Sequence, residues 1–277
     1  MLENSNVTTK RSCQLVGLSR TGWYRPPQES TQNVQIRSRL RQLASERSAF
    51  GSPRLTILLR REFGAINHKR VERLYAEEDL QLPRRPKRRR RGVSRPLPRI
   101  EVIAPRQRGS MDFMHDVLAD GRRFRLFNLV DDFSRRCLTI QADTSLNGQR
   151  VSRILEALRQ ADRLPGTIVC DNGPEFTSKA MLKWSLDTGI KLDFIEPGKP
   201  TQNAFIESFN GKFRQECLRQ HWFRSLHEVR EVVEAWRLDY NHVRPHSSLD
   251  YQTPMEVVRQ HEMIKNQSLT SHWACVR

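Results

Sequence analysis

The sequence predicts an α/β protein with a mixed five-stranded sheet flanked by helices, preceded by a small all-α region. After Glu101 three candidate strands follow one another closely, and after Gly148 helical and strand patterns alternate. Consecutive strands tend to pair antiparallel, whereas strands separated by helices pair parallel. The sheet is therefore expected to contain both strand directions and to carry helices on both faces.

The all-α region, 33–82, is expected to form three helices. Its apolar residues recur every three or four positions, and a Gly-Ser-Pro turn after Phe50 and a Gly-Ala turn after Phe63 separate the runs. The last run opens with basic residues after a tight turn, which is the layout of a helix-turn-helix that reads the DNA major groove. A plain helical hairpin with a solvated basic face fits the same residues. The candidate DNA contacts here are Lys69, Arg70 and Arg73.

Charge indicates a polyanionic partner. The chain holds 48 Lys and Arg against 31 Asp and Glu, a net charge of +17, and its isoelectric point is about 10.5. Segment 83–100 carries nine of the cations and no acid. A run of like charge broken by prolines cannot form a core, so we expect an extended linker along DNA phosphates, the alternative being a solvated tether without a partner. Its candidate contacts are Arg88, Arg89, Arg90 and Arg91.

Cysteine usage and hydropathy exclude several classes of protein. The five cysteines are scattered, without a CxxC pair or a His pair at zinc-finger spacing, which predicts reduced thiols and no structural zinc. No run of about 18 apolar residues exists, and no apolar stretch near Met1 resembles a signal peptide. We therefore expect a cytosolic protein without a membrane partner. His242 and His246 lack metal-site spacing and are expected to be structural.

The strands and helices after Glu101 are identified by their periodicity. The first strand alternates polar and apolar residues, the second is mostly apolar, and TIVC is a fully apolar strand that ends at Asp171. Helical spacing marks the segments between them. The expected strands are 110–118, 123–130, 136–143, 167–170 and 191–196, and the expected helices are 148–161 and 178–188.

Three acids are candidates for chemistry. Asp112 lies inside an apolar strand, where a carboxylate is costly to desolvate unless a cation or metal neutralises it. Asp171 stands at the carboxyl end of a buried strand, where α/β sheets collect their ligands. Glu207 lies on a helix, away from the apolar side of that helix; an ordinary exposed Glu that pairs with Lys212 or Arg214 is the alternative.

Spacing alone does not separate these acids from their neighbours. Three converging carboxylates would require Mg²⁺ or Mn²⁺, because like charges repel at short range. The competing acids in or near the same strands are Asp116, Asp120, Asp131, Asp132 and Asp143.

Several motifs resemble those of a known family. SMDF, CDNGPEF and KPTQNAFIESFNGKFRQECL, with 35 residues between Asp171 and Glu207, resemble the DD(35)E signature of retroviral integrases and bacterial insertion-sequence transposases. DYNHVRPHSSLDYQTP (239–254) is similar to the tail motif of transposases of the IS-three family, and the chain resembles their second-frame product, OrfB. The resemblance spans 33–260. Gly109 departs from it, since the family commonly has Trp three residues before the first Asp, which predicts different packing under Asp112.

The resemblance implies a ribonuclease-H-like core that cleaves DNA strands and transfers them. It implies that Asp112, Asp171 and Glu207 are catalytic and bind two Mg²⁺ (or Mn²⁺) ions. Water first frees a 3′-hydroxyl at the element end, and that hydroxyl then attacks another phosphodiester, without a covalent enzyme intermediate. Cations near the metals are expected to hold the scissile strand. Those candidates are Lys199, Lys212 and Arg214.

The resemblance also implies partners and a location. The partners are double-stranded DNA, from the terminal repeats of the element and from the target, further copies of the chain in an oligomer on DNA, and the product of the upstream reading frame. The location is the bacterial cytoplasm, in association with the nucleoid. The expected organisation is an N-terminal helical remnant (1–32), a helix-turn-helix region (33–82), a basic linker (83–100), a catalytic core with C-terminal helices (101–260) and a tail (261–277).

Two other functions compete with transposition. A non-catalytic product of a decayed element would only occupy transposon ends, and a ribonuclease-H-type nuclease would act on RNA in hybrids. The carboxylates of Asp112, Asp171 and Glu207 argue against the first, and a separate DNA-binding region argues against the second. Resolvase-like chemistry through a serine or tyrosine is a weaker third, because nothing marks an activated hydroxyl.

Overall fold

The computed structural model describes residues 8–24, 30–83, 101–196 and 198–274. The predicted phosphate contacts Arg88 to Arg91 lie outside these residues, as does Cys275. Within the described ranges, no helix is both long enough and apolar enough to cross a bilayer.

Two short helices, α1 (Thr9–Leu15) and α2 (Arg20–Tyr24), come first along the chain. Thr8 begins α1, because its hydroxyl accepts a hydrogen bond from the backbone N–H of Arg11. Leu15 is exposed, as are Val16 and Leu18, so this short amphipathic segment buries little of its apolar surface in the chain.

Three further helices pack around a core of their own, and we call them the helical unit. The Asn67 side chain caps the last of them by accepting from the N–H of Lys69, and Gly64, at a φ of 78°, ends the second in a conformation that favours glycine. The buried residues include Ile36, Leu40, Leu55, Leu59, Val71 and Leu74. The three predicted helices are thus confirmed as α3 (Thr31–Glu46), α4 (Ser52–Phe63) and α5 (His68–Glu77).

The second part of the chain is built on a five-stranded sheet. Its strands lie in the order β3-β2-β1-β4-β5, with β2 antiparallel to both β1 and β3, and with β4 parallel to both β1 and β5. This is the ribonuclease-H-like arrangement, so the predicted mixed sheet is confirmed. The strands are β1 (Arg108–Val117), β2 (Arg123–Asp131), β3 (Cys137–Asp143), β4 (Thr167–Cys170) and β5 (Lys191–Phe194).

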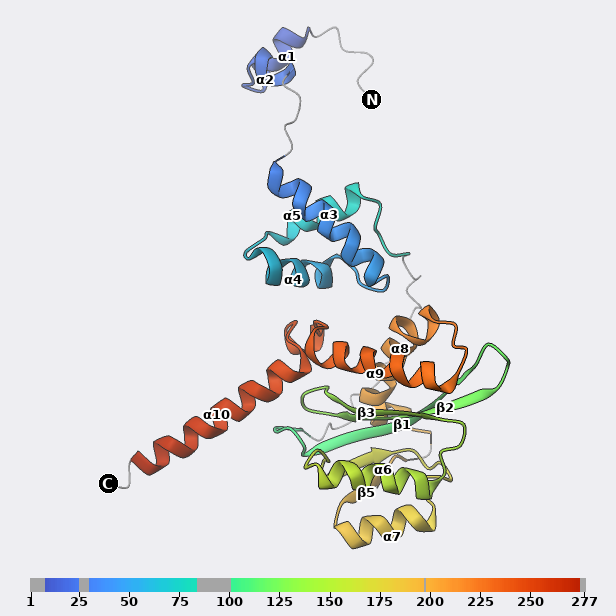
Figure 1. The fold of residues 1–277 in the computed structure, drawn as a ribbon. Helices are drawn as coiled ribbons and strands as arrows, with labels where there is room; N and C mark the ends of the chain where they lie inside the picture. Colours follow the sequence, from blue (N-terminus) through green and yellow to red (C-terminus); the bar gives the residue numbers. More distant parts are fainter. Residues whose placement is uncertain (1–7, 25–29, 84–100, 197, 275–277) are drawn as a thin grey trace.

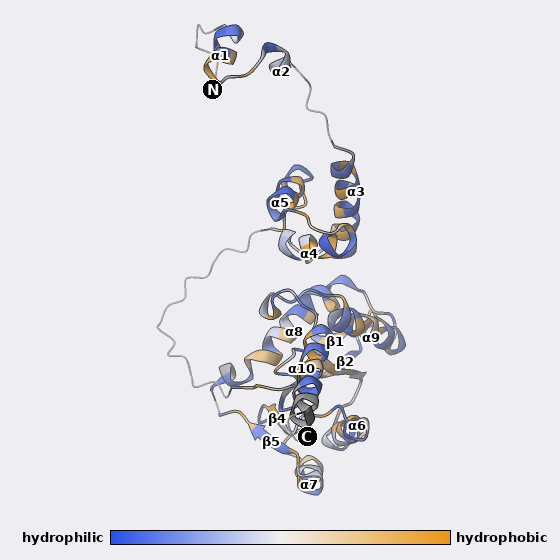
Figure 2. Cartoon of the chain, turned by 90° about the vertical axis from the view of Figure 1, so that its left-hand side faces the viewer, coloured by the Kyte–Doolittle hydropathy of each residue, from blue (hydrophilic) through white to orange (hydrophobic). Residues whose placement is uncertain are grey.

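Helices cover both faces of this sheet (Figure 1). One apolar core lies under α6 (Gly148–Gln160) and α7 (Lys179–Thr188), and the other under α8 (Ala204–Glu216) and α9 (Leu226–His242). Short 3₁₀ turns at Pro200–Asn203, Leu218–Gln220 and Ser247–Leu249 connect the later helices. Figures 1 and 2 show the helical unit on the α8–α9 side of the sheet and α10 (Pro254–Ala274) extending away from it.

Side chains of α9 satisfy the backbone of β3 at one edge of the sheet. The Asn241 amide accepts from the N–H of Cys137 and donates to its carbonyl, both at 2.8 Å. Arg237 donates to the same carbonyl, and Arg230 donates to the carbonyl of Ala142. These bonds replace the partner strand that β3 lacks, which fixes α9 against the sheet.

Gly109 shows why the chain departs from the family pattern at this position. A Cβ atom here would lie 2.7 Å from Cγ of Pro165 and 3.0 Å from the carbonyl oxygen of Val130. Both distances are too short for a side chain, so β1 and the segment before β4 approach each other closely, three residues before Asp112.

Candidate active site

Asp112 and Asp171 lie on neighbouring parallel strands. The pairing of β1 with β4 ends at Ser110 and Val169, two residues before each acid, and the charge of Asp171 acts on Asp112. Asp171 follows β4 directly and accepts a hydrogen bond from the N–H of Gly173 at 3.0 Å. Both carboxylates therefore stand at the carboxyl edge of β4, where an open α/β sheet places its ligands.

The helix α8 brings Glu207 to the same region. Glu207 and Asn210 are three residues apart, so they lie on the same side of the helix. The Asn210 amide donates to Oδ2 of Asp112 at 2.7 Å, and its own oxygen accepts from the amide of buried Asn128 at 2.8 Å. This chain of amides fixes the Glu207 side of α8 over Asp112.

The three carboxylates interact through their charges. Burial, together with the negative charges of Asp171 and Glu207, raises the pKa of Asp112 to about 6. Hydrogen bonds from the N–H of Phe113 and from Asn210 act in the opposite direction. The structure thus brings together the three acids that the sequence singled out.

The oxygen donors fit a hard divalent cation. Asp112, Asp171 and Glu207 supply carboxylates only, which Mg²⁺ and Mn²⁺ prefer over thiolate-rich sets. In the described ranges, however, no three His, Cys, Asp or Glu side chains are grouped tightly enough to hold an ion. Mutual repulsion keeps like charges apart, and both oxygens of Asp112 already accept hydrogen bonds.

The competing acids have structural roles. Asp131 accepts from the N–H and hydroxyl of Ser134, and Asp132, whose pKa burial raises to about 6, accepts from the hydroxyl of Ser110. The remaining three hold local contacts: Asp116 with the N–H of Val117, Asp120 with Arg122, and Asp143 with Arg150.

Two of the three basic candidates on α5 are exposed. Lys69 lies in the first turn of the helix, and Arg73 pairs with Glu77 at 3.5 Å. Arg70 instead turns inward and donates to Asn33, Gln32 and Ser30 at the start of α3. Arg70 therefore holds α5 against α3, while Lys69 and Arg73 remain accessible.

The three candidates for holding the scissile strand have different surroundings in the structure. Arg214 is exposed and, seven residues after Glu207, lies on the same side of α8. Lys199 forms an ion pair with Glu196. Lys212 is half-buried on another side of α8.

Sequence reasoning missed Asn210 and Asn128. Neutral amides carry no charge signal, and a buried Asn in a strand is not distinctive by itself. The spacing of Asn210 after Glu207 was the available signal, since residues three apart share one side of a helix.

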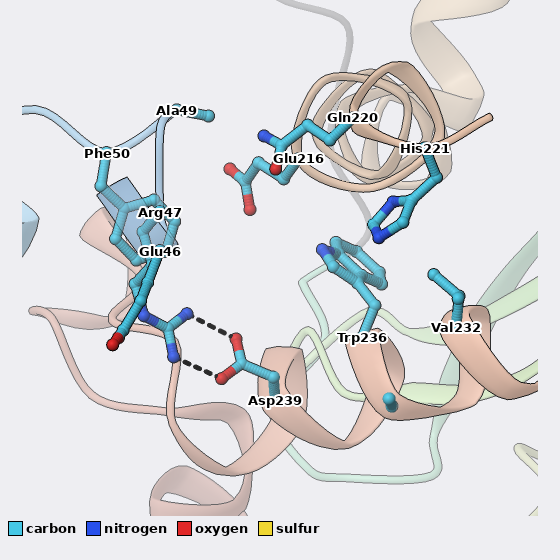
Figure 3. A pocket seen from close by; sticks show the side chains of 11 residues that line it. Glu46, Arg47, Ala49, Phe50, Glu216, Gln220, His221, Val232, Trp236 and Asp239 are labelled. Atoms are coloured by element: carbon cyan, nitrogen blue, oxygen red, sulfur yellow. Dashed lines mark hydrogen bonds and ion pairs between the residues drawn. The ribbon is translucent and has the colours of Figure 1, made fainter. Parts of the chain in front are cut away.

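A cavity of about 380 Å³ lies where the helical unit meets α8 and α9, and Figure 3 shows its lining. Arg47 crosses this seam and donates two hydrogen bonds to the carboxylate of Asp239, at 2.6 and 2.8 Å. Phe50 and Trp236 provide apolar walls. None of the three candidate catalytic acids lines this cavity, so it belongs to the seam between the two units.

Comparison with known proteins finds family matches for the helical unit and for the sheet with its helices. Residues 32–88 match a family described as HTH-like domain, and residues 104–200 and 188–254 match two described as integrase core domain. A 31.7 kDa protein of insertion element IS407 from Burkholderia multivorans is 43% identical over 94% of this chain and 93% of its own length. The transposase for insertion sequence element IS904 from Lactococcus lactis is 24% identical, over 84% of this chain and 96% of its own.

Among solved structures, the catalytic core domain of the HTLV-2 integrase, in complex with magnesium, is similar to this chain. The TM-score is 0.43 at 18% sequence identity, and the similarity covers 56% of this chain and 98% of that domain.

Proposed function

Because this chain belongs to the OrfB-type transposases of the IS-three family of insertion sequences, we propose that it cuts and joins DNA strands at a site formed by Asp112, Asp171 and Glu207. The observation that supports this proposal is that the negative charges of Asp171, after β4, and Glu207, on α8, act on the partly buried carboxylate of Asp112 on β1. A protein that only occupies DNA ends has no need of such mutual repulsion, which costs stability.

The three carboxylates would hold two Mg²⁺ or Mn²⁺ ions. Bound divalent metal supplies an activated attacking oxygen and stabilises the leaving oxygen at phosphorus. Asn210 orients Asp112 through its amide hydrogen bond, and Asn128 in turn orients Asn210. Such supporting hydrogen bonds fix a ligand before the ion arrives.

The remaining assignments belong to the same proposal. Arg214, on the Glu207 side of α8, would hold a phosphate of the reacting strand. Lys69 and Arg73 are placed to contact DNA from α5. Assembly of several copies on DNA, association with the product of the upstream reading frame, and residence at the nucleoid complete the proposal.

The test uses labelled duplex that carries the element's own ends, with Mg²⁺, Mn²⁺ or EDTA. We expect metal-dependent nicking and strand joining by the wild type, and none by Asp171→Asn. Asp187→Asn, an exposed acid of α7, is the matched control and should keep full activity. Circular dichroism verifies that all three proteins are folded.

Two outcomes contradict the proposal. Equal cleavage by Asp171→Asn and the wild type would remove Asp171 from the chemistry. Binding without cleavage under any metal, even after addition of the upstream product, would favour a non-catalytic occupant of transposon ends. An RNA–DNA hybrid of the same sequence tests the nuclease alternative, which predicts preferential cleavage of the RNA strand.

A further inference from the structure

A second charged side of α8 faces the helical unit. Lys212 and Glu216 lie one turn apart there. Arg54 of α4 donates to Glu216 at 3.4 Å, and Arg244, from the segment after α9, donates to both oxygens of Glu216 at 2.5 and 2.6 Å. Three segments that are distant in sequence therefore converge on one carboxylate.

A fourth cation joins them from the turn between β2 and β3. The guanidinium of Arg135 lies 3.6 Å from the ring centroid of Phe205 on α8, and its charge acts on Lys212. We call these four residues the seam cluster: Arg54, Arg135, Lys212 and Arg244.

Three cations of the seam cluster, Arg54, Lys212 and Arg244, lie around one carboxylate. Glu216 already accepts from Arg54 and from Arg244, which is almost fully buried. The ammonium of Lys212 makes no hydrogen bond or close ion pair within the part of the chain that the structure describes. The surroundings of Lys212 therefore keep a positive charge.

The electrostatics of Lys212 show the cost of this arrangement. Burial, together with the charges of Arg244, Arg54 and Arg135, lowers its pKa to about 8, while the charge of Glu216 acts in the opposite direction. A half-buried ammonium among guanidinium groups destabilises the folded chain unless an anion joins it.

We propose that the seam cluster binds a phosphate of the DNA backbone, so that one DNA strand contacts the helical unit and the catalytic core at the same point. This inference rests on the proposed function, because it assigns a further contact to the same substrate. Phosphate oxygens are suited to the site, since guanidinium groups bind them through charge-assisted hydrogen bonds.

The surface of α8 leaves a path from this site to the carboxylates. Going around the helix from Glu207 to Lys212, the intervening residues are Gly211 and Ser208, which are both exposed. A Cβ atom on Gly211 would meet nothing within 4 Å. A strand held at the seam cluster can therefore pass over small residues to reach Glu207, which favours a polynucleotide over a free phosphate ion.

The first experiment measures DNA binding by the full chain in EDTA, where no cleavage occurs. Affinity for the end-bearing duplex is titrated against salt for the wild type, Lys212→Met and the control Lys183→Met. Lys183 is exposed on α7, on the opposite face of the sheet. Loss of one phosphate contact should make the log-log salt dependence shallower by about 0.9 in Lys212→Met and leave it unchanged in Lys183→Met.

Thermal unfolding at pH 7 is the second readout. Lys212→Met removes a poorly compensated cation, so we expect its melting temperature to equal or exceed that of the wild type although its affinity for DNA falls. A purely structural lysine would give the reverse, a lower melting temperature together with unchanged salt dependence. Either an unchanged salt slope or a loss of binding that follows unfolding overturns the inference.

Two further measurements use inorganic phosphate as a competitor and the Asp171→Asn variant as a second background. Inorganic phosphate at matched ionic strength should displace the duplex no better than chloride, and displacement would assign the site to a free anion instead. The titration is repeated in the Asp171→Asn background. A shallower slope for Lys212→Met in that background upholds the phosphate site even if the wild type does not cleave. An unchanged slope, together with normal cleavage by the wild type, refutes the phosphate site and leaves the proposed function standing.

Discussion

At the scale of single residues, Asn210 is the side chain on which the candidate site depends most. It joins buried Asn128 to Asp112, and it stands three residues after Glu207 on the same helix. An amide can accept from one neighbour and donate to the other at once, which a carboxylate or an ammonium cannot do. Asn210 therefore sets the position of Asp112 relative to α8.

We expect Asn210→Ala to weaken metal use. The variant frees the carboxylate of Asp112 and leaves the buried Asn128 amide without an acceptor, at a cost of about 1–3 kcal/mol. Loss of such support for a metal ligand lowers metal affinity or activity by about 10- to 100-fold. The measurement is strand joining as a function of Mg²⁺ concentration, with the midpoint expected to rise.

The matched control is Asn147→Ala, which removes the cap of α6. The Asn147 side chain accepts from the N–H of Arg150, and losing such a cap costs about 1 kcal/mol of stability. Its Mg²⁺ midpoint should equal that of the wild type. A similar shift in both variants would mean that lost stability, rather than the position of Asp112, causes the effect.

At the scale of elements, the helix α8 contains one glycine, Gly211, that is not needed to avoid a steric clash. Glycine in a helix interior is less stable than alanine by about 0.5–1 kcal/mol, and Gly211 has open space beside it. By contrast, Gly109 in β1 has no room for a side chain. Packing inside the fold therefore explains Gly109, whereas packing within the chain does not explain Gly211.

We predict opposite stability changes for the two alanine variants. Gly211→Ala should raise the free energy of unfolding by about 0.5–1 kcal/mol and lower the affinity for DNA, because the new methyl group projects where a strand would lie. Gly109→Ala should destabilise by about 1–3 kcal/mol, because neighbouring backbone must move. Urea unfolding and filter binding measure both. Unchanged DNA affinity in Gly211→Ala would exclude close approach of DNA at this point.

The segment after Tyr240 shows where sequence reasoning stops at this scale. Its polar residues were interpreted as a family tail motif in an irregular region. In the structure several of them are buried: Asn241 bonds to the backbone of β3, Arg244 pairs with Glu216, and burial lowers the pKa of His246 to about 3. Polar residues have no periodicity that reveals burial, because each is stabilised by one distant partner.

At the scale of the whole molecule, the seam between the helical unit and the core depends on a few charged contacts. The pair of Arg47 and Asp239 joins residues that are 192 positions apart in the chain, and Arg61 donates to the carbonyl of Val243. Both contacts join the helical unit to α9 or to the segment that follows it, so they set how α3–α5 lie relative to α9.

Charge reversal tests this seam. Arg47→Glu places two acids face to face, so we expect the helical unit to unfold at lower urea concentration than the core and the single transition to split into two. The double variant Arg47→Glu with Asp239→Arg should restore one transition. Circular dichroism reports both units. A double variant that behaves like Arg47→Glu alone would mean that the pair does not couple them.

The sequence predicted the elements of both units but not how the units meet. The five strands and the helices follow from periodicity. Asp112 was found because a carboxylate in an apolar strand is conspicuous and Asp171 because it follows a buried strand, whereas Glu207 depended on the resemblance to a known family. The relative placement of the units rests on pairs such as Arg47 with Asp239, and a charged pair on two helices leaves no local pattern. The two partners of such a pair lie far apart in the sequence, so no stretch of neighbouring residues reveals that they meet.

The bonds between α9 and β3 have a consequence for how copies of the chain can associate. A free edge strand recruits strands of other molecules, and the hazard grows where several copies gather at high local concentration. Asn241, Arg237 and Arg230 occupy backbone groups that such recruitment would need. If several copies assemble on one DNA molecule as proposed, these bonds disfavour aggregation through β3 and leave side-chain surfaces for association.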